Sequence, residues 1–144
     1  MVNYWFCVTN MDNWNIVKKR KTWGVSDRHK GQMEKVELGD ILAFYVKGNQ
    51  LAGTFKAISK PFKSDEVIFN STGFIKAEQF QYRVKLEPLL VLEKPIRFDG
   101  LVPKLQFIFN KKKWGTRLMG RAMFTIPKED YELIEVEIKK TLGS

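Results

Sequence analysis

The chain has 144 residues and a mass of 16.9 kDa. This length predicts one domain over residues 1–144, which would bury roughly two thirds of the surface that the unfolded chain exposes. Hydrophobic residues make up 44% of the sequence and charged residues 28%, as in ordinary globular proteins, so disordered, collagen-like and disulfide-rich classes are disfavoured. The 25 Lys and Arg residues outnumber the 16 Asp and Glu residues and give a formal net charge of +9, which favours a polyanionic partner.

The residue types that carry metal binding and nucleophilic catalysis are scarce. Cys7 is the only cysteine and His29 the only histidine, whereas a zinc site needs several such ligands together. Cys7 lies within an apolar run and is expected to be a buried structural thiol. Neither a P-loop nor a dinucleotide-binding glycine motif occurs. We therefore expect no metal, no cofactor and no catalytic constellation.

No part of the sequence indicates a membrane protein. The first residues lack a secretion signal, and no stretch approaches the roughly 20 apolar residues that cross a bilayer. The most amphipathic segment, residues 127–142, carries five acidic residues that anionic lipid would repel. We expect a soluble, cytoplasmic protein without a membrane partner.

The chain begins with a pattern that predicts a strand leading into a helix. Residues 4–8 form a short aromatic run, typical of a buried strand. Asn10 or Asp12 is placed to cap the helix that follows. This helix runs to Lys21, and the basic residues near its end give it a positively charged face.

The next segment, residues 22–25, interrupts the helical pattern and is expected to be irregular. Ser26 or Asp27 then caps a second short helix that extends through residue 36.

Two apolar runs predict a β-hairpin in the middle of the chain. Residues 41–46 and 51–58 flank the turn sequence Lys47-Gly48-Asn49-Gln50. Because nearly every position in both runs is apolar, the strands should lie centrally, with both faces covered or inside a barrel. Gly53 in mid-strand indicates a bulge or a close approach of another chain segment.

The second half of the chain predicts a loop, a long strand and a final helix. Residues 61–78 have mixed character and are interpreted as a long functional loop. Strict alternation over residues 80–87, with Arg83 on the polar side, predicts a strand that bends at Pro88 and continues to residue 92. Pro127 at the first helical position, acidic residues after it and apolar residues at helical spacing predict a C-terminal helix.

Tryptophans close to basic residues point toward a base-binding function. Trp5 in mid-strand and Trp14 on the apolar side of the first helix are assigned to the core. Trp23 instead follows the basic run 18–21 and precedes a flexible glycine. Its segment is too irregular to form a row of apolar side chains facing the core. An aromatic ring on a loop beside cations is suited to stacking one base while the cations hold its phosphates.

Several motifs occur in an order that resembles the EVE-domain family, whose small PUA-like barrel is related to the YTH readers of methylated adenine. The motifs are Tyr4-Trp5-Phe6-Cys7-Val8-Thr9-Asn10, Asn13-Trp14, Trp23-Gly24-Val25, Leu38-Gly39-Asp40, the strand 41–46, Gly53 and Ile126-Pro127-Lys128-Glu129-Asp130-Tyr131. The resemblance spans most of the chain and implies an α+β fold, a small PUA-like mixed β-barrel with flanking helices. It also implies a module that binds RNA, or single-stranded or modified DNA, and captures a modified base in an aromatic pocket.

The resemblance assigns roles to individual residues of this pocket. Trp23 is expected to form one wall, and Asn10 to hydrogen-bond the edge of the base. Backbone groups around Gly24 and Val25 are expected to read its exocyclic amine. Related families have a tryptophan at the second wall, where this sequence offers three phenylalanines, in order of preference Phe69, Phe74 and Phe80.

Basic residues outside the pocket are predicted to bind the phosphate backbone, although a lysine run is as often only a solvated face. The predicted residues are Lys18, Lys21, Arg28, Lys30, Lys111, Lys113, Arg117 and Arg121. Trp114 directly follows the run 111–113 and so interleaves an aromatic ring with charge. On this interpretation phosphates supply affinity and the pocket supplies selectivity.

The sequence leaves one alternative from the enzyme class. A PUA-like hydrolase acting on modified nucleosides would use a lysine as nucleophile or base together with a carboxylate. Lys21 or Lys30 would be that lysine, and Glu34 its carboxylate partner. Such a lysine must be desolvated to react, which neighbouring cations on an exposed helix achieve only in part.

Overall fold

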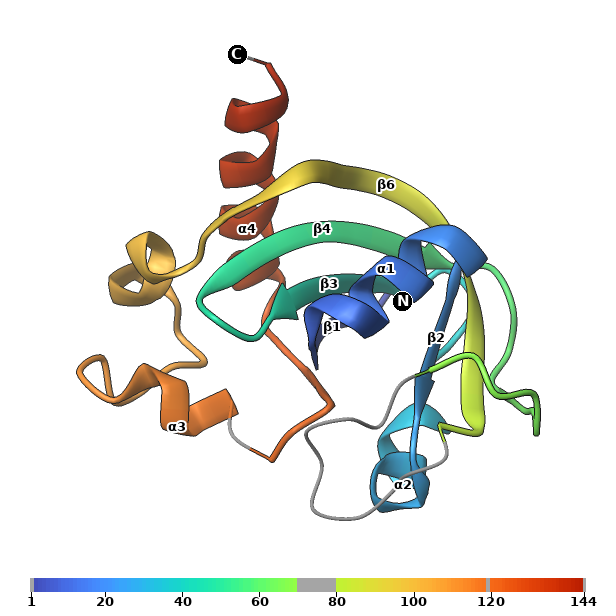
Figure 1. The fold of residues 1–144 in the computed structure, drawn as a ribbon. Helices are drawn as coiled ribbons and strands as arrows, with labels where there is room; N and C mark the ends of the chain where they lie inside the picture. Colours follow the sequence, from blue (N-terminus) through green and yellow to red (C-terminus); the bar gives the residue numbers. More distant parts are fainter. Residues whose placement is uncertain (1, 70–79, 119, 144) are drawn as a thin grey trace.

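A strongly curved mixed sheet forms the framework of the molecule (Figure 1). The computed structural model describes residues 2–69, 80–118 and 120–143. In this part of the chain the strands are β1 (Tyr4–Thr9), β2 (Thr22–Val25), β3 (Ile41–Val46), β4 (Gln50–Ala57), β5 (Phe62–Lys63), β6 (Tyr82–Arg97) and β7 (Met123–Thr125). The α-helices are α1 (Met11–Arg20), α2 (Lys30–Met33), α3 (Trp114–Leu118) and α4 (Lys128–Leu142), and two 3-10 helices span Asp27–His29 and Asp99–Lys104.

The strands lie in the order β2-β6-β4-β3-β1-β7, with β5 also paired to β6. The described pairs are antiparallel except β1 with β3, which run parallel. The long strand β6 pairs with β2 and β5 through its first residues and with β4 through the rest. This curls the sheet into a half-barrel with helices around it, so the predicted α+β fold is confirmed.

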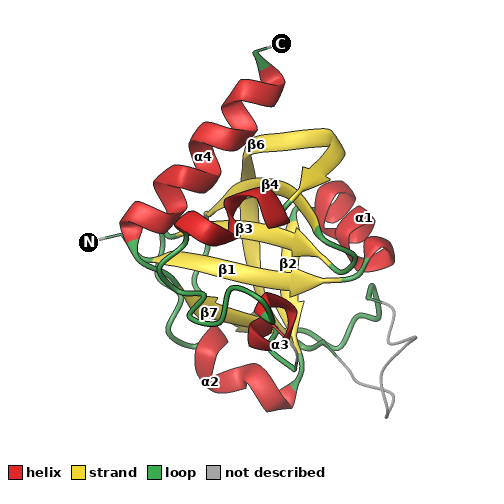
Figure 2. Cartoon of the chain, turned by 90° about the vertical axis from the view of Figure 1, so that its left-hand side faces the viewer, coloured by secondary structure: helices red, strands yellow, loops and turns green. Residues whose placement is uncertain are grey.

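The sheet is covered on both faces. Trp5 and Cys7 of β1 pack in one core cluster, while Phe6 and Val8 of the same strand pack in a second. Helix α1 contributes to the first cluster and α4 to the second, so the two helices lie on opposite sides of the sheet (Figure 2). Two buried faces explain why β1, β3 and β4 are apolar at nearly every position, as predicted. Burial also raises the pKa of the Cys7 thiol, in keeping with a structural role.

Asp40 ties the start of β1 to the start of β3. Its fully buried carboxylate accepts hydrogen bonds from the backbone N–H of Asn3 at 2.9 Å and of Glu37 at 2.8 Å. It also accepts one from Nε1 of Trp5 at 3.0 Å. A buried carboxylate is tolerated only with such partners, so this cluster of bonds fixes the register at which the parallel strands begin.

Most of the predicted elements are confirmed, including β1, α1, the hairpin of β3 and β4, and α4. Asn10 caps α1, because its Oδ1 accepts a hydrogen bond from the Asn13 backbone N–H at 2.8 Å. The predicted bend of the long strand lies at Pro88, opposite Phe55, where the register between β4 and β6 shifts.

The prediction of an irregular segment at residues 22–25 is wrong, because these residues form β2 and pair with residues 82–85 of β6. A strand of four residues is too short to show a period, and its partner lies about sixty positions away in the sequence. The second short helix is present but is divided between residues 27–29 and α2, and ends at Met33. The structure also contains α3, β7, the 3-10 helix 99–104 and, inside the predicted loop 61–78, the short strand β5, none of which the sequence pattern predicts.

Gly53 lies where β4 passes directly against β6, which confirms the predicted close approach. A Cβ atom at this position would stand 2.7 Å from the Leu90 carbonyl oxygen and 3.0 Å from the Val91 Cα. Both are backbone atoms of a central strand, which cannot move aside as a flexible side chain would.

We expect Gly53→Ala to lower the free energy of unfolding by about 2 kcal/mol, the usual size of an overpacking effect. Gly100→Ala is the matched control, because an added Cβ there meets no atom within 4 Å. Urea denaturation of both variants measures the difference. Equal stability of the two would contradict the close approach at Gly53.

Candidate functional site

A recess opens where β1 ends, between α1, β2 and residues 120–122. Its volume, counting the part that opens to solvent, is about 550 Å³. Its described lining consists of an aromatic wall, a group of amides and a set of basic side chains, which come from segments far apart in the sequence.

Three aromatic rings form the wall of the recess. Trp23 of β2 is perpendicular to Phe69, with ring centres 6.4 Å apart, and Phe69 is in turn edge-on to Phe80 at 5.8 Å. The indole also packs at 5.3 Å against Phe44 in the core and is only 4% exposed. The expectation of a free ring on a loop is therefore wrong: Trp23 lies on a strand and is held rigidly, with the recess beside it.

Gly24 allows the aromatic wall to approach β2 closely. A Cβ atom at this position would lie 2.8 Å from Cε2 of Phe69 and 3.1 Å from the Phe80 carbonyl oxygen. Any side chain here would therefore push Phe69 outward and change the shape of the recess.

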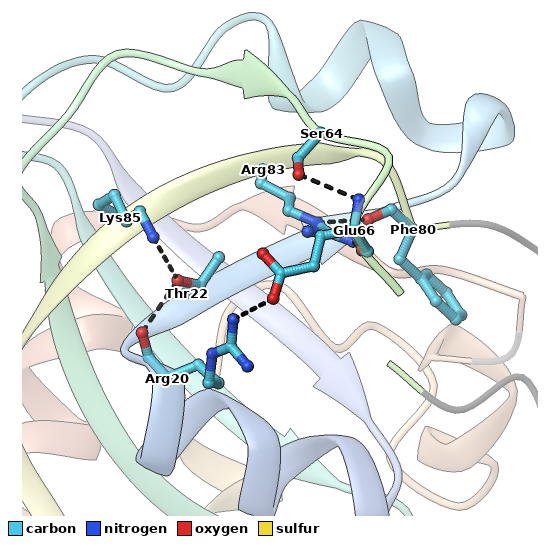
Figure 3. Close-up of polar contacts among 7 residues, drawn as sticks. All are labelled: Arg20, Thr22, Ser64, Glu66, Phe80, Arg83 and Lys85. Atoms are coloured by element: carbon cyan, nitrogen blue, oxygen red, sulfur yellow. Dashed lines mark hydrogen bonds and ion pairs between the residues drawn. The ribbon is translucent and has the colours of Figure 1, made fainter. Parts of the chain in front are cut away.

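The buried side chain of Arg83 holds the two phenylalanine segments together (Figure 3). Its Nε donates to the Phe80 carbonyl at 2.8 Å, and its Nη2 donates to the Glu66 carbonyl. The guanidinium carbon also lies 5.6 Å from the centre of the Phe69 ring. Burial lowers the pKa of Arg83, but a guanidinium stays charged in proteins, so the clamp is cationic.

Arg20 of α1 holds the same segment from the other side (Figure 3). Its guanidinium lies 2.5 Å from the Glu66 carboxylate, and this hydrogen bond and charge keep the pKa of Glu66 below its usual value. The pair therefore stabilises the fold above the ordinary pKa of a glutamate, and this contribution is lost as the pH falls through the lowered one. Because both side chains are well exposed, the contribution is small.

Two amide side chains, Asn10 and Asn13, lie where β1 passes into α1 and border the recess. The Oδ1 atom of Asn10 accepts the hydrogen bond of the helix cap, so Nδ2 is the donor group of this side chain. Asn13 is 4% exposed, so it is a polar group at the inner side of the recess.

Basic side chains complete the lining. Arg28, His29, Lys47 and Arg121 border the recess, and no Asp or Glu occurs among its described lining residues. The Arg121 guanidinium lies over the Phe124 ring, 4.1 Å from its centre, which fixes its position. The arrangement suits a flat, uncharged group with an anion attached to it.

The comparisons with known proteins place the chain in a family. The model of the EVE domain matches residues 3–137. A UPF0310 protein of Pyrococcus abyssi is 43% identical over 143 residues, covering 93% of this chain and 98% of that protein. The chain belongs to the EVE-domain family.

Solved structures show how widely this EVE fold occurs. A hypothetical protein from Leishmania major superposes with a TM-score of 0.67 at 13% identity, over 99% of this chain and 98% of that one. The YTH domain-containing protein mmi1, solved as a complex with RNA, superposes with a TM-score of 0.63 at 12% identity, over 99% of this chain and 88% of that one. At such identities the likeness shows a shared fold, which agrees with the PUA-like barrel that the sequence resemblance implies.

This EVE domain brings most of the predicted base-site residues to one place. Asn10, Trp23, Gly24 and Phe69 border the recess. Val25 does not occur among its described lining residues, and its side chain is 1% exposed in the core. Phe74 lies outside the described residues.

The predicted phosphate-binding residues are more scattered over the EVE domain. Arg28 and Arg121 border the recess, whereas the remaining predicted residues are not among its described lining residues. On α1, Lys18 lies 5.7 Å from the centre of the Trp14 ring, and Lys21 is the C-cap of the helix. Lys30 pairs with Glu34 at 3.7 Å, and Lys111 donates to the Leu105 carbonyl. Lys113 is exposed, and the Arg117 side chain lies outside the described part.

Sequence reasoning misses several residues that line or support the recess, among them Asn13, Lys47 and Arg83. The sequence assigns Lys47 to a hairpin turn, but its backbone N–H donates to the Thr9 carbonyl at 2.8 Å, beside the end of β1. The alternating pattern places Arg83 on the solvent face, whereas its side chain turns inward and is 4% exposed. For Asn13 a usable signal exists, because it precedes Trp14 on the buried side of a capped helix.

We expect Arg83→Lys to lower the free energy of unfolding by about 2 kcal/mol, because a lysine cannot reach both carbonyls and leaves one unpaired. Arg20→Ala removes only an exposed ion pair and should lower it by less than about 1 kcal/mol. Chemical denaturation of both variants at neutral pH measures this contrast. A loss for Arg83→Lys no larger than that for Arg20→Ala would show that Arg83 is not the clamp.

In the described part of the chain, no helix is long and apolar enough to span a membrane. The same part holds no group of three or more His, Cys, Asp or Glu side chains arranged to bind a metal ion.

Proposed function

We propose that the protein binds single-stranded nucleic acid and holds one modified base in the recess beside Trp23, without catalysing a reaction. The observation that carries this proposal is the composition of the recess. Aromatic rings, amides and basic side chains from segments far apart in the sequence meet there. Each of these groups has a counterpart in a nucleotide: the face of the base, its edge and its phosphate.

The aromatic wall supplies the contact with the base. Every base has a flat π face, and stacking on one ring contributes about 1–3 kcal/mol. Trp23 is fixed by Phe44 and Phe69, so little conformational entropy is lost when a base packs against it. The Nδ2 donor of Asn10 then meets an acceptor on the edge of the base.

The basic side chains supply the contact with the backbone. Arg28, Lys47 and Arg121 border the recess, and each can neutralise one phosphate. Three contacts with a single strand would give log K a slope of about −2 against log salt. The complex of mmi1 with RNA supports this proposal, because a domain of the same fold there carries a nucleic acid.

We favour binding over hydrolysis because the candidate catalytic residues lie outside the described lining of the recess. Lys30 and Glu34 form an ion pair at 3.7 Å with both side chains more than half exposed, and Lys21 is also exposed. A lysine in bulk water is not desolvated as a nucleophile requires. Release of a product from a modified nucleoside in the presence of the protein would favour the enzyme instead.

The test is a titration of single-stranded RNA and DNA pentanucleotides, plain or with one methylated adenine or cytosine at the centre, by fluorescence anisotropy. We expect Trp23→Phe to weaken the tightest complex about fivefold to tenfold, because a smaller ring stacks less strongly. The matched control is Trp14→Phe. Trp14 is a buried indole of the same core cluster that packs 5.4 Å from the same Phe44, but it is not among the described lining residues.

Both substitutions should lower stability by similar amounts, so only the position relative to the recess distinguishes them. In each indole Nε1 is buried and has no hydrogen-bond partner among the described residues, and phenylalanine removes that group. Equal affinity of the two variants for every pentanucleotide would exclude the recess as the base site. Binding by Trp14→Phe should stay within about twofold of the wild type.

A further inference from the structure

A second recess lies directly beside the first, between the end of β3 and α3. Its volume, again counting the part open to solvent, is about 590 Å³. Val8, Lys47 and Gly120 border both recesses, so the two are consecutive parts of one groove. The groove runs from the aromatic wall on β2, past the end of β1, to α3.

The floor of the second recess is apolar and rigid. Tyr45 is 6% exposed and Leu118 is 5% exposed. The Tyr45 ring is held edge-on to Trp114 at 6.2 Å, and its hydroxyl accepts a hydrogen bond from the Asn49 backbone N–H at 3.0 Å. This floor offers a flat group a fixed surface to lie on.

The rim of the second recess is open and basic. Gly115 has no atom within 4 Å of where its Cβ would stand, so the backbone of α3 is accessible there. Lys47 stands at the junction of the two recesses, and the exposed run 111–113 directly precedes α3. No Asp or Glu occurs among the described lining residues of either recess, so the whole groove is complementary to an anionic ligand.

We propose that the second recess receives the nucleotide next to the one held in the first, with the phosphate between them at Lys47. This inference rests on the proposed function and extends it from a single base to a dinucleotide step. Its basis is the repeated arrangement: a recess with an aromatic wall, a cation that borders both recesses, and a second recess with a rigid apolar floor. A strand of nucleic acid has the same repeat of base, phosphate and base.

The experiment compares two probes on one variant. The probes are the pentanucleotide that binds the wild type most tightly and the nucleoside 5′-monophosphate of its central base. Gly115→Leu places a large side chain at the edge of the second recess, because Gly115 borders that recess and is not among the described residues of the first. The helix α3 should tolerate leucine, since the position is open and leucine favours helices more than glycine does.

We expect Gly115→Leu to weaken the pentanucleotide fivefold or more and to change monophosphate binding by less than twofold. Gly100→Leu is the matched control at another open glycine, away from the groove, and should change neither. Thermal unfolding of both variants establishes that they are folded. Unchanged pentanucleotide binding by a folded Gly115→Leu protein overturns the proposal and leaves the recess to another occupant.

The same measurement separates this proposal from the one on which it rests. If the wild type binds the monophosphate and the pentanucleotide equally well, the first recess is a base site and the second subsite is excluded. If the wild type binds neither probe, the proposed function fails, and the inference fails with it.

Discussion

The buried guanidinium of Arg83 is the interaction on which the aromatic wall depends. It donates to the carbonyl of Glu66 and to that of Phe80, and its face lies against the ring of Phe69. A buried charge without partners would destabilise the fold by several kcal/mol, so separating the two carbonyls from the guanidinium would lower the stability of the fold. One side chain from the long strand β6 therefore sets the position of two of the three rings beside the recess.

Trp23 and Asn10 are held by regular elements. Trp23 is fixed on β2 by its pairing with β6 and by Phe44, and Gly24 lets Phe69 approach the same strand. Asn10 is held by the cap that it supplies to α1. Side chains built on strands and helix ends hold their geometry better than side chains on loops, which suits the base site that we propose.

The elements that the sequence predicts well are those whose periodic or apolar pattern extends over many residues. The alternation in β6, the apolar runs of β3 and β4, and the helical spacing in α4 each extend over six residues or more. The strand β2 has only four residues, and its pairing depends on a partner far along the chain, so neither period nor composition reveals it.

The site is harder to predict than the fold, because its residues meet only in three dimensions. The resemblance to the EVE family brings Asn10, Trp23 and Gly24 together, which no spacing rule does. Lys47 and Arg83 escape prediction for physical reasons: a turn lysine normally points to solvent, and a binary pattern cannot distinguish a buried arginine from an exposed one. Trp23 shows the opposite case, since it is a core residue that also borders the recess.

The most direct test of the base-binding account is an NMR titration that follows the indole N–H signals of the four tryptophans during addition of the tightest-binding pentanucleotide. The account predicts that the signals of the Trp23 indole and the Gly24 amide move. The Trp14 indole and the Trp5 indole, which is bonded to Asp40, should stay in place. Shifts confined to the amides of the basic run 111–113, with Trp23 unmoved, would contradict it and leave only electrostatic binding.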